Sequence, residues 1–290
     1  MRACGWENQM FCRRAFTVTK TKIPSAGRDI RILILQPTAA AKPAGSTPGI
    51  LWIHGGGYAT GMAGMVYMSR ARNLVRRYGA VVISPAYRLS GEKPYPAALE
   101  DCYAALTYLK THTAALGCNP NQLMVGGESA GGGLTAALCM YARDRGEVRI
   151  AFQMPLYPML DDRDTDSSRS NHGISWNTAR NHRAWKAYLA EVAGEPPAYA
   201  APARQTDYRN LPPAYTFVGD REPFFCETLA YVARLREAGV PAQADVYPTG
   251  FHAFDMLLPF RKISKQAAAA FEQHYLRAAA HCFAKQEESV

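Results

Sequence analysis

Short apolar runs that alternate with helix-forming segments are the feature that most constrains the fold of this 290-residue chain. Each run has apolar side chains at neighbouring positions, which is typical of a strand buried on both faces. The clearest runs cover residues 49–53, 80–84, 122–126, 150–155 and 214–218. Because right-handed crossovers place helices on both sides of such strands, the sequence predicts an α/β fold with a mostly parallel central sheet.

Helices are predicted between these strands, and further strands on either side of them. The helix at 97–117 follows Pro96, which suits a first helical turn, and Gly117 can end it. Its Leu99, Cys102 and Leu106 fall at helical spacing. Other helices are predicted at residues 69–78, 130–143, 226–238 and 264–283, and other strands at 16–21, 30–36 and 242–247.

Residues 157–210 interrupt the alternation. They begin with a polar, acidic loop and continue into a predicted helix at 174–192 that carries Trp176, Trp185 and Tyr188. An insertion between strands of an α/β sheet commonly forms a lid or a pocket wall. We therefore expect one domain over residues 1–290 with a lid inside it, whose aromatic residues either line a pocket or form the lid's own core.

Charge and cysteine content argue against several classes of protein. The formal net charge of +9 comes from scattered basic residues, without a block of like charges or a nucleic-acid motif. The seven cysteines form no C-x-x-C pair, and Cys102 and Cys139 fall inside predicted helices, where a thiol is a small buried hydrophobe. We expect no nucleic-acid partner, no metal and no cofactor.

Signals for export or membrane insertion are missing from the sequence. The N-terminal stretch has no continuous apolar segment of a signal peptide, and no apolar run approaches the ~20 residues of a membrane span. Together with unpaired cysteines, this predicts a cytoplasmic protein. The sequence leaves the oligomeric state open, a homo-oligomer included.

A G-x-S-x-G motif, Gly127-Glu128-Ser129-Ala130-Gly131, lies between a predicted strand and a predicted helix. A sharp strand-to-helix turn exposes a serine hydroxyl, and flanking glycines let neighbouring backbone pass without a Cβ clash. The helix N-terminus offers N–H groups to negative charge that develops nearby. Ser129 is therefore the candidate nucleophile.

A second glycine-rich stretch, His54-Gly55-Gly56-Gly57, directly follows the apolar run that ends at Ile53. Backbone N–H groups can approach an oxyanion there because no side chain intervenes. The pairing of the two motifs in this order resembles the signature of α/β-hydrolases.

A nucleophilic serine needs a base and an orienting acid, which follow it in the order acid and then histidine in α/β-hydrolases. His252 lies in a loop after the last predicted strand, whereas the other six histidines precede the serine or lie in the predicted lid or on the terminal helix. The acid is expected after the run 214–218, where the residues alone leave Asp220 and Glu222 as alternatives.

The chain resembles the hormone-sensitive-lipase-like branch of the α/β-hydrolases, the bacterial acetyl-esterase-like carboxylesterases, from about residue 50 to the last helix. The matching stretches are residues 54–57, His-Gly-Gly-Gly; 87–89, Tyr-Arg-Leu; 94–101, Pro-Tyr-Pro-Ala-Ala-Leu-Glu-Asp; 127–132, Gly-Glu-Ser-Ala-Gly-Gly; and 251–254, Phe-His-Ala-Phe. The resemblance implies Ser129 as nucleophile, His252 as base and the backbone N–H groups of Gly56, Gly57 and Ala130 as the oxyanion hole.

The resemblance also bears on the acid, because family members usually carry an Asp-Pro pair before the following helix. Here the residue before Pro223 is Glu222, which favours Glu222 over Asp220 although the side chain is longer. The matched Arg88, Glu100 and Asp101 are expected to form structural ion pairs. The short segment before the His-Gly-Gly-Gly stretch implies a reduced cap.

The predicted function is that of a serine esterase acting on small, short-acyl carboxylic esters through a Ser-His-acid triad and an acyl-enzyme. Two alternatives stay open at this point. An amidase or peptidase can use the same triad on the same fold. A non-catalytic ligand-binding relative is the other, although such relatives lack the histidine that is present here as His252.

Overall fold

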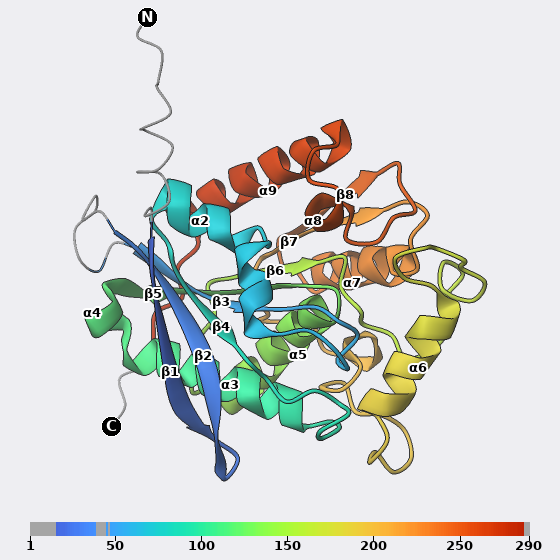
Figure 1. Ribbon diagram of the computed structural model, residues 1–290, viewed down its shortest axis with the longest axis horizontal. Helices are drawn as coiled ribbons and strands as arrows, with labels where there is room; N and C mark the ends of the chain where they lie inside the picture. Colours follow the sequence, from blue (N-terminus) through green and yellow to red (C-terminus); the bar gives the residue numbers. More distant parts are fainter. Residues whose placement is uncertain (1–15, 39–44, 46, 287–290) are drawn as a thin grey trace, which may run out of the picture.

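A sheet of eight strands forms the centre of the computed structural model, which describes residues 16–38, 45 and 47–286 (Figure 1). The strands are β1 Phe16–Ser25, β2 Arg28–Pro37, β3 Thr47–Ile53, β4 Val81–Pro85, β5 Cys118–Glu128, β6 Phe152–Leu156, β7 Ala214–Gly219 and β8 Ala242–Tyr247. Their order is β1-β2-β4-β3-β5-β6-β7-β8; the pairs β1–β2 and β2–β4 are antiparallel, and all pairs from β4 to β8 are parallel. The predicted mostly parallel sheet is confirmed.

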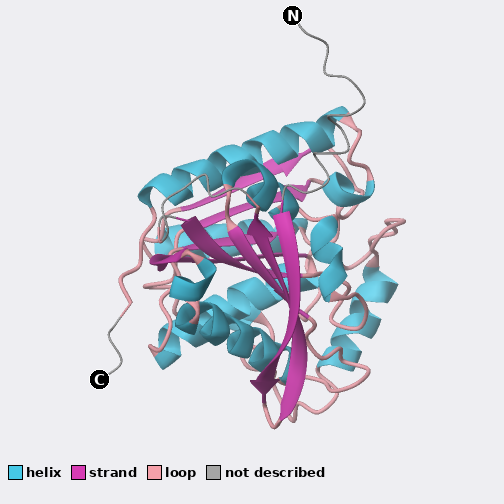
Figure 2. Ribbon diagram, turned by 60° about the vertical axis from the view of Figure 1, so that its left-hand side comes forward, coloured by secondary structure: helices cyan, strands magenta, loops and turns pink. Residues whose placement is uncertain are grey.

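Helices cover both faces of this sheet (Figure 2). The helices are α2 Ala71–Tyr78, α3 Ala97–Thr111, α4 Thr113–Leu116, α5 Ala130–Arg145, α6 Thr178–Tyr188, α7 Phe225–Glu237, α8 Phe254–Leu257 and α9 Lys262–His281, with short 3₁₀ turns η2 Ala63–Tyr67 and η3 Pro202–Arg204. Within the described ranges, none is long and apolar enough to cross a bilayer.

Strand β3 shows why the buried strands read as continuous apolar runs. Leu51 and Ile53 belong to the core shared with α3, α5 and α7, whereas Ile50 and Trp52 belong to the core shared with α2 and α9. Successive side chains of a strand point to opposite faces, so a strand between two helical layers needs apolar residues at every position.

Several elements differ from the predicted ranges for local reasons. The N-terminal hairpin is longer than predicted, because only Ala26 and Gly27, both with positive φ, form its turn. Pro24 lies within β1, which is tolerated because β1 is an edge strand. Helix α6 begins at Thr178, four residues after the predicted start, because the Asn177 side chain caps it by accepting from the N–H of Arg180.

A buried ion pair joins the loop after β4 to α3. The guanidinium of Arg88 donates to both carboxylate oxygens of Asp101 at 2.9 Å, and Asp101 also accepts from the hydroxyl of Ser25 at 2.6 Å. Arg88 reaches Glu100 at 3.2 Å. The predicted ion pairs of these residues are confirmed, and they join β1, the segment after β4 and α3.

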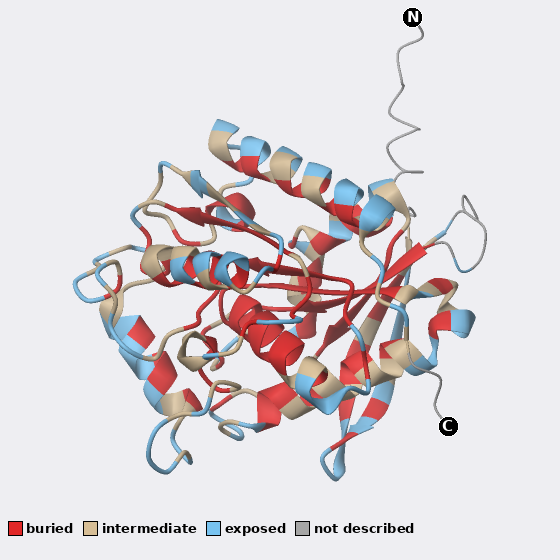
Figure 3. Cartoon of the chain, turned by 180° about the vertical axis from the view of Figure 1, so that it is seen from behind, coloured by how far each residue is buried: buried red, intermediate tan, exposed pale blue. Residues whose placement is uncertain are grey.

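The two glycine-rich motifs meet at the carboxyl ends of the central strands. The His54–Gly57 stretch follows β3, and Ser129 lies between β5 and α5, which is buried through most of its length in the middle of the molecule (Figure 3). A Cβ atom on Gly131 would come within 2.1 Å of the carbonyl oxygen of Ile53. Only glycine therefore lets the start of α5 approach β3 this closely.

Candidate active site

Ser129 occupies a strained turn between β5 and α5. Its φ is 58° and its ψ is −118°, a conformation that non-glycine residues rarely adopt. The backbone is held in this conformation on both sides. The N–H of Ser129 donates to Leu156 at 3.0 Å, and its carbonyl accepts from Gly133 at 2.9 Å and from Met159 at 3.0 Å. These bonds oppose relaxation of the turn and keep its side chain at the edge of the sheet.

His252 lies between the hydroxyl of Ser129 and the carboxylate of Glu222. Its Nε2 is 2.8 Å from Ser129 Oγ, and its Nδ1 contacts Glu222 Oε2. Because an ionised carboxylate can only accept, Nδ1 carries the proton and Nε2 is left to accept from the serine hydroxyl. The side chains of Glu222 and His252 are almost completely buried.

The loop after β7 separates the two acids that sequence reasoning left open. The second carboxylate oxygen of Glu222 accepts from the N–H of Gly219 at 2.7 Å, which fixes the side chain beneath the imidazole. Asp220 is partly exposed, and its carboxylate pairs with Arg221 at 3.3 Å. The structure therefore brings Ser129, His252 and Glu222 together and does not bring Asp220 to the histidine.

The His54–Gly57 loop packs directly on the serine turn. A Cβ atom on Gly55 would lie 3.2 Å from the Cβ of Ser129, and Gly56 and Gly57 have φ values of 124° and 59°. Ala130 begins α5, where the first N–H groups of a helix have no partner within the helix. The three predicted oxyanion residues therefore lie on two backbone segments that flank Ser129.

Aromatic rings surround the imidazole of His252. Phe224 and Tyr157 meet it edge to face, with ring centroids at 4.9 Å and 5.1 Å. Trp176 lies 6.3 Å from the same ring and against Gly57, where an added Cβ would meet the indole at 2.4 Å. Sequence reasoning missed Tyr157, although its place directly after a buried strand could have indicated it.

Other aromatic residues of the predicted lid belong to its core instead. Trp185 and Tyr188 are buried and pack against Tyr58, whose ring stacks on that of Tyr188 at 3.9 Å. The lid aromatics thus divide into two sets. Trp176 lies by the candidate site, together with Phe224, which lies outside residues 157–210. Trp185 and Tyr188 instead anchor this segment to Tyr58, which follows the His54–Gly57 stretch.

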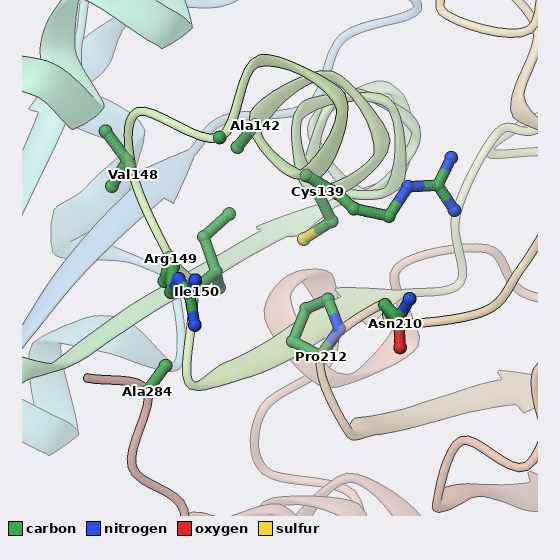
Figure 4. A pocket seen from close by; sticks show the side chains of 10 residues that line it. Cys139, Ala142, Val148, Arg149, Ile150, Asn210, Pro212 and Ala284 are labelled. Carbon is green, nitrogen blue, oxygen red and sulfur yellow. The ribbon is translucent and has the colours of Figure 1, made fainter. Parts of the chain in front are cut away.

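No group of three or more histidine, cysteine or acidic side chains in the described part of the chain is arranged to hold a metal ion. Cys102 and Cys139 are buried and free, as predicted, whereas Cys4 and Cys12 lie outside the described residues. A cavity of about 460 Å³ between α5 and the start of β6 is lined by Cys139, Ile150 and Pro212, among others (Figure 4). Ile150 and Pro212 precede their strands, so this cavity lies at the opposite edge of the sheet from Ser129.

Glu128, directly before the serine, is a buried carboxyl group with an unusual proton affinity. Both of its oxygens accept from Trp52 Nε1 at 2.9 Å. Burial, reinforced by the nearby Asp255 carboxylate, raises the pKa of Glu128 to about 8, while Trp52 and Arg70 act in the opposite direction. Near neutral pH the side chain is therefore mostly protonated.

This raised pKa predicts how stability depends on pH. Between pH 4.5, the ordinary pKa of glutamate, and about pH 8, the folded protein holds a proton that the unfolded chain has lost. Glu128 should therefore contribute a fall in the free energy of unfolding as pH rises through this window, with a slope of about 1.4 kcal/mol per pH unit from this group. Glu128→Gln should remove this fall, so that the variant gains stability relative to the wild type between pH 5 and pH 9, as measured by denaturant unfolding. Parallel pH dependences for both proteins would contradict the assignment.

Comparisons with known proteins identify the family of this chain. A family model described as the alpha/beta hydrolase fold matches residues 50–256. Esterase LipI of Mycobacterium tuberculosis is 34% identical over 213 residues, 71% of this chain and 65% of that protein. An acetyl-hydrolase of Streptomyces hygroscopicus is 31% identical over 228 residues, 77% of this chain and 74% of that protein. The match to LipI thus spans slightly less than two thirds of that relative.

Solved structures of other proteins share the fold of this chain. The structure of a protein described as bacterial heroin esterase superimposes with a TM-score of 0.86 at 34% identity, over 92% of this chain and 85% of that one. The predicted resemblance is therefore confirmed. The chain belongs to the α/β-hydrolase family, in its hormone-sensitive-lipase-like branch.

Proposed function

We propose that this protein is a serine esterase that hydrolyses small carboxylic esters with short acyl groups. The observation that carries the proposal is the continuous contact from Glu222 through His252 to Ser129, with 2.8 Å between Nε2 and Oγ. A nucleophile, a base and an orienting acid are thereby within hydrogen-bond reach of one another. The names of the similar proteins, esterases and an acetyl-hydrolase, support the same reaction class.

In the first half of the proposed reaction, Ser129 Oγ attacks the ester carbonyl carbon and gives its proton to His252 Nε2. The negative charge on the former carbonyl oxygen is stabilised by the N–H groups of Gly56, Gly57 and Ala130. Glu222 accepts from Nδ1 and stabilises the imidazolium ion. His252 then protonates the leaving alcohol, and the acyl group stays on the serine.

In the second half, water takes the place of the alcohol. His252 removes a proton from the water as it attacks the acyl carbon, and a second tetrahedral oxyanion forms at the same N–H groups. Collapse of this intermediate returns the proton to Ser129 Oγ and releases the carboxylic acid. Ser129, His252, Glu222 and the N–H groups of the proposed oxyanion hole thus serve in both halves of the cycle.

Limited space at Ser129 supports the preference for short acyl groups. The serine is 7% exposed, and the indole of Trp176 lies against Gly57 and near His252. We therefore propose that residues 157–210 form a lid that narrows the space above the nucleophile. A bulky acyl group would have to displace this ring before its carbonyl could reach the proposed oxyanion hole.

Loss of the nucleophile is the first test. Ser129→Ala should lower kcat on 4-nitrophenyl acetate by roughly 10⁶-fold, because the residual site cannot form the acyl-enzyme. The wild-type protein should hydrolyse the acetate faster than the octanoate, and faster than the matching anilide. Near-normal turnover by Ser129→Ala would remove the assignment, and a preference for the anilide would favour an amidase.

The acid is tested by two isosteric variants. Glu222→Gln should lower kcat by roughly 10³- to 10⁴-fold, because the amide N–H₂ group would favour the wrong imidazole tautomer. Asp220→Asn is the matched control from the same loop and should retain wild-type kcat. An equal loss in both variants, or a loss in Asp220→Asn alone, would refute the role of Glu222.

The lid's part in specificity is tested at Trp176. Trp176→Ala should raise kcat/KM for 4-nitrophenyl hexanoate relative to the acetate by roughly 10-fold, since the added methylenes gain the space the indole leaves. Ile174→Ala is the control, because Ile174 belongs to the same segment but is 83% exposed. An unchanged acyl-length profile in Trp176→Ala would show that another residue sets the limit.

A further inference from the structure

Asp255 joins three segments of the chain behind the candidate site. It lies in α8, three residues after His252, and is completely buried. Its Oδ1 accepts from the hydroxyl of Tyr157 at 2.9 Å, and its Oδ2 forms an ion pair with Arg70 Nε at 3.0 Å. Arg70 Nη2 also donates to the backbone carbonyl of Asp255 at 3.0 Å. Asp255 thereby links the loop that carries His252 to Tyr157, which follows β6, and to Arg70, which precedes α2.

Tyr157 joins this link to the imidazole of His252 and directly follows the residue that holds the backbone of Ser129. Its ring lies edge to face with the imidazole of His252, at a centroid distance of 5.1 Å and an interplanar angle of 81°. Its backbone N–H donates to Phe217 at 3.0 Å, and the preceding Leu156 carbonyl accepts from the N–H of Ser129. Movement of Tyr157 would therefore change its distance to the imidazole while the serine turn stays anchored.

The hydrogen bond to Glu222 cannot hold the imidazole by itself. A single bond at Nδ1 fixes one direction of the ring but leaves the ring free to tilt about that bond. During the proposed reaction Nε2 must turn from Ser129 Oγ to the leaving oxygen, so the serine cannot hold the other end throughout. Ring contacts have to limit the tilt, and Tyr157 is one of the two rings that meet the imidazole edge to face.

Burial of the charged side chains of Arg70 and Asp255 behind Tyr157 costs free energy. Removing an arginine and a carboxylate from water costs several kcal/mol per ion, and buried ion pairs are often no more stabilising than apolar side chains of similar size. A second carboxyl group, Glu128, faces the same cluster and interacts electrostatically with Asp255 and Arg70. A gain in folding free energy is therefore a weak explanation of the buried Asp255–Arg70 pair. Fixing the orientation of the Tyr157 ring explains the pair directly.

We infer that Tyr157, held by the Asp255–Arg70 pair, is a positioning residue that limits the tilt of His252. This inference rests on the proposed function, because positioning has a kinetic effect only if His252 is the base. The ring of Tyr157 contacts the imidazole. The hydroxyl of Tyr157 acts indirectly, by holding that ring in place.

The test compares two hydroxyl deletions. Tyr157→Phe removes the bond to Asp255 and keeps the ring, and it should lower kcat on 4-nitrophenyl acetate by roughly 10-fold with KM unchanged, because small misplacements of catalytic groups have large kinetic effects. Tyr215→Phe is the matched control: Tyr215 is also buried, and its hydroxyl donates to Asp245 at 2.8 Å near the start of β7. It should lose stability but keep wild-type kcat.

A spectroscopic readout separates positioning from activity. The proton between His252 Nδ1 and Glu222 should give a downfield resonance in proton NMR spectra, which should shift or broaden in Tyr157→Phe and stay in place in Tyr215→Phe. If Tyr157→Phe does not fold, Asp255→Asn takes its place, with the same fall in kcat expected. Wild-type kcat and an unshifted resonance in a folded variant would overturn the inference. A wild-type protein without esterase activity would instead overturn the proposed function, and the resonance would still report on the ring.

Discussion

The close approach of the start of α5 to the end of β3 is the constraint on which the rest of the site depends. Added Cβ atoms on Gly127 and Gly131 would lie 2.5 Å and 2.1 Å from the same Ile53 carbonyl oxygen. With both glycines in place, the serine turn and the His54–Gly57 loop share one small volume. Ser129 can then hold its positive φ because its backbone is bonded on both sides. A larger residue at either glycine would move the proposed nucleophile away from the proposed donors Gly56 and Gly57.

Four buried titratable side chains gather at this end of the sheet, in addition to the buried Asp101 on the other side of the core. Glu128, Glu222, His252 and Asp255 are almost fully enclosed, and each has a specific partner: Trp52, Gly219, Ser129 and Tyr157, respectively. Such groups oppose folding unless their bonds are made. Their concentration around one serine is the pattern expected where local strain and buried charge serve chemistry rather than stability.

Much of the architecture could be predicted from the sequence because it depends on short-range patterns. Apolar runs located the central strands, and two glycine motifs located Ser129 and the loop beside it. The residues alone left Asp220 and Glu222 open, and only the resemblance favoured Glu222, since the choice depends on how the Gly219 N–H holds the Glu222 carboxylate in place. The hydrogen bond between Tyr157 and Asp255 could not be predicted from the sequence either, because it joins residues 98 positions apart and produces no local sequence pattern. The start of α6 was misplaced because the apolar Ile174 and Trp176 suggested a helix that Asn177 in fact begins.

The division of the lid aromatics has a consequence for how enzymes of this architecture can diverge. Trp176 lies near His252 and against Gly57, on a segment that contributes neither the proposed nucleophile nor its base, and Trp185 and Tyr188 hold that segment independently. Replacement of Trp176 can therefore change the space proposed for the acyl group, while Trp185 and Tyr188 still hold the segment and the contact from Glu222 through His252 to Ser129 persists. In the proposed function, substrate range and reaction chemistry therefore depend on separate stretches of the polypeptide, so that either can change without the other.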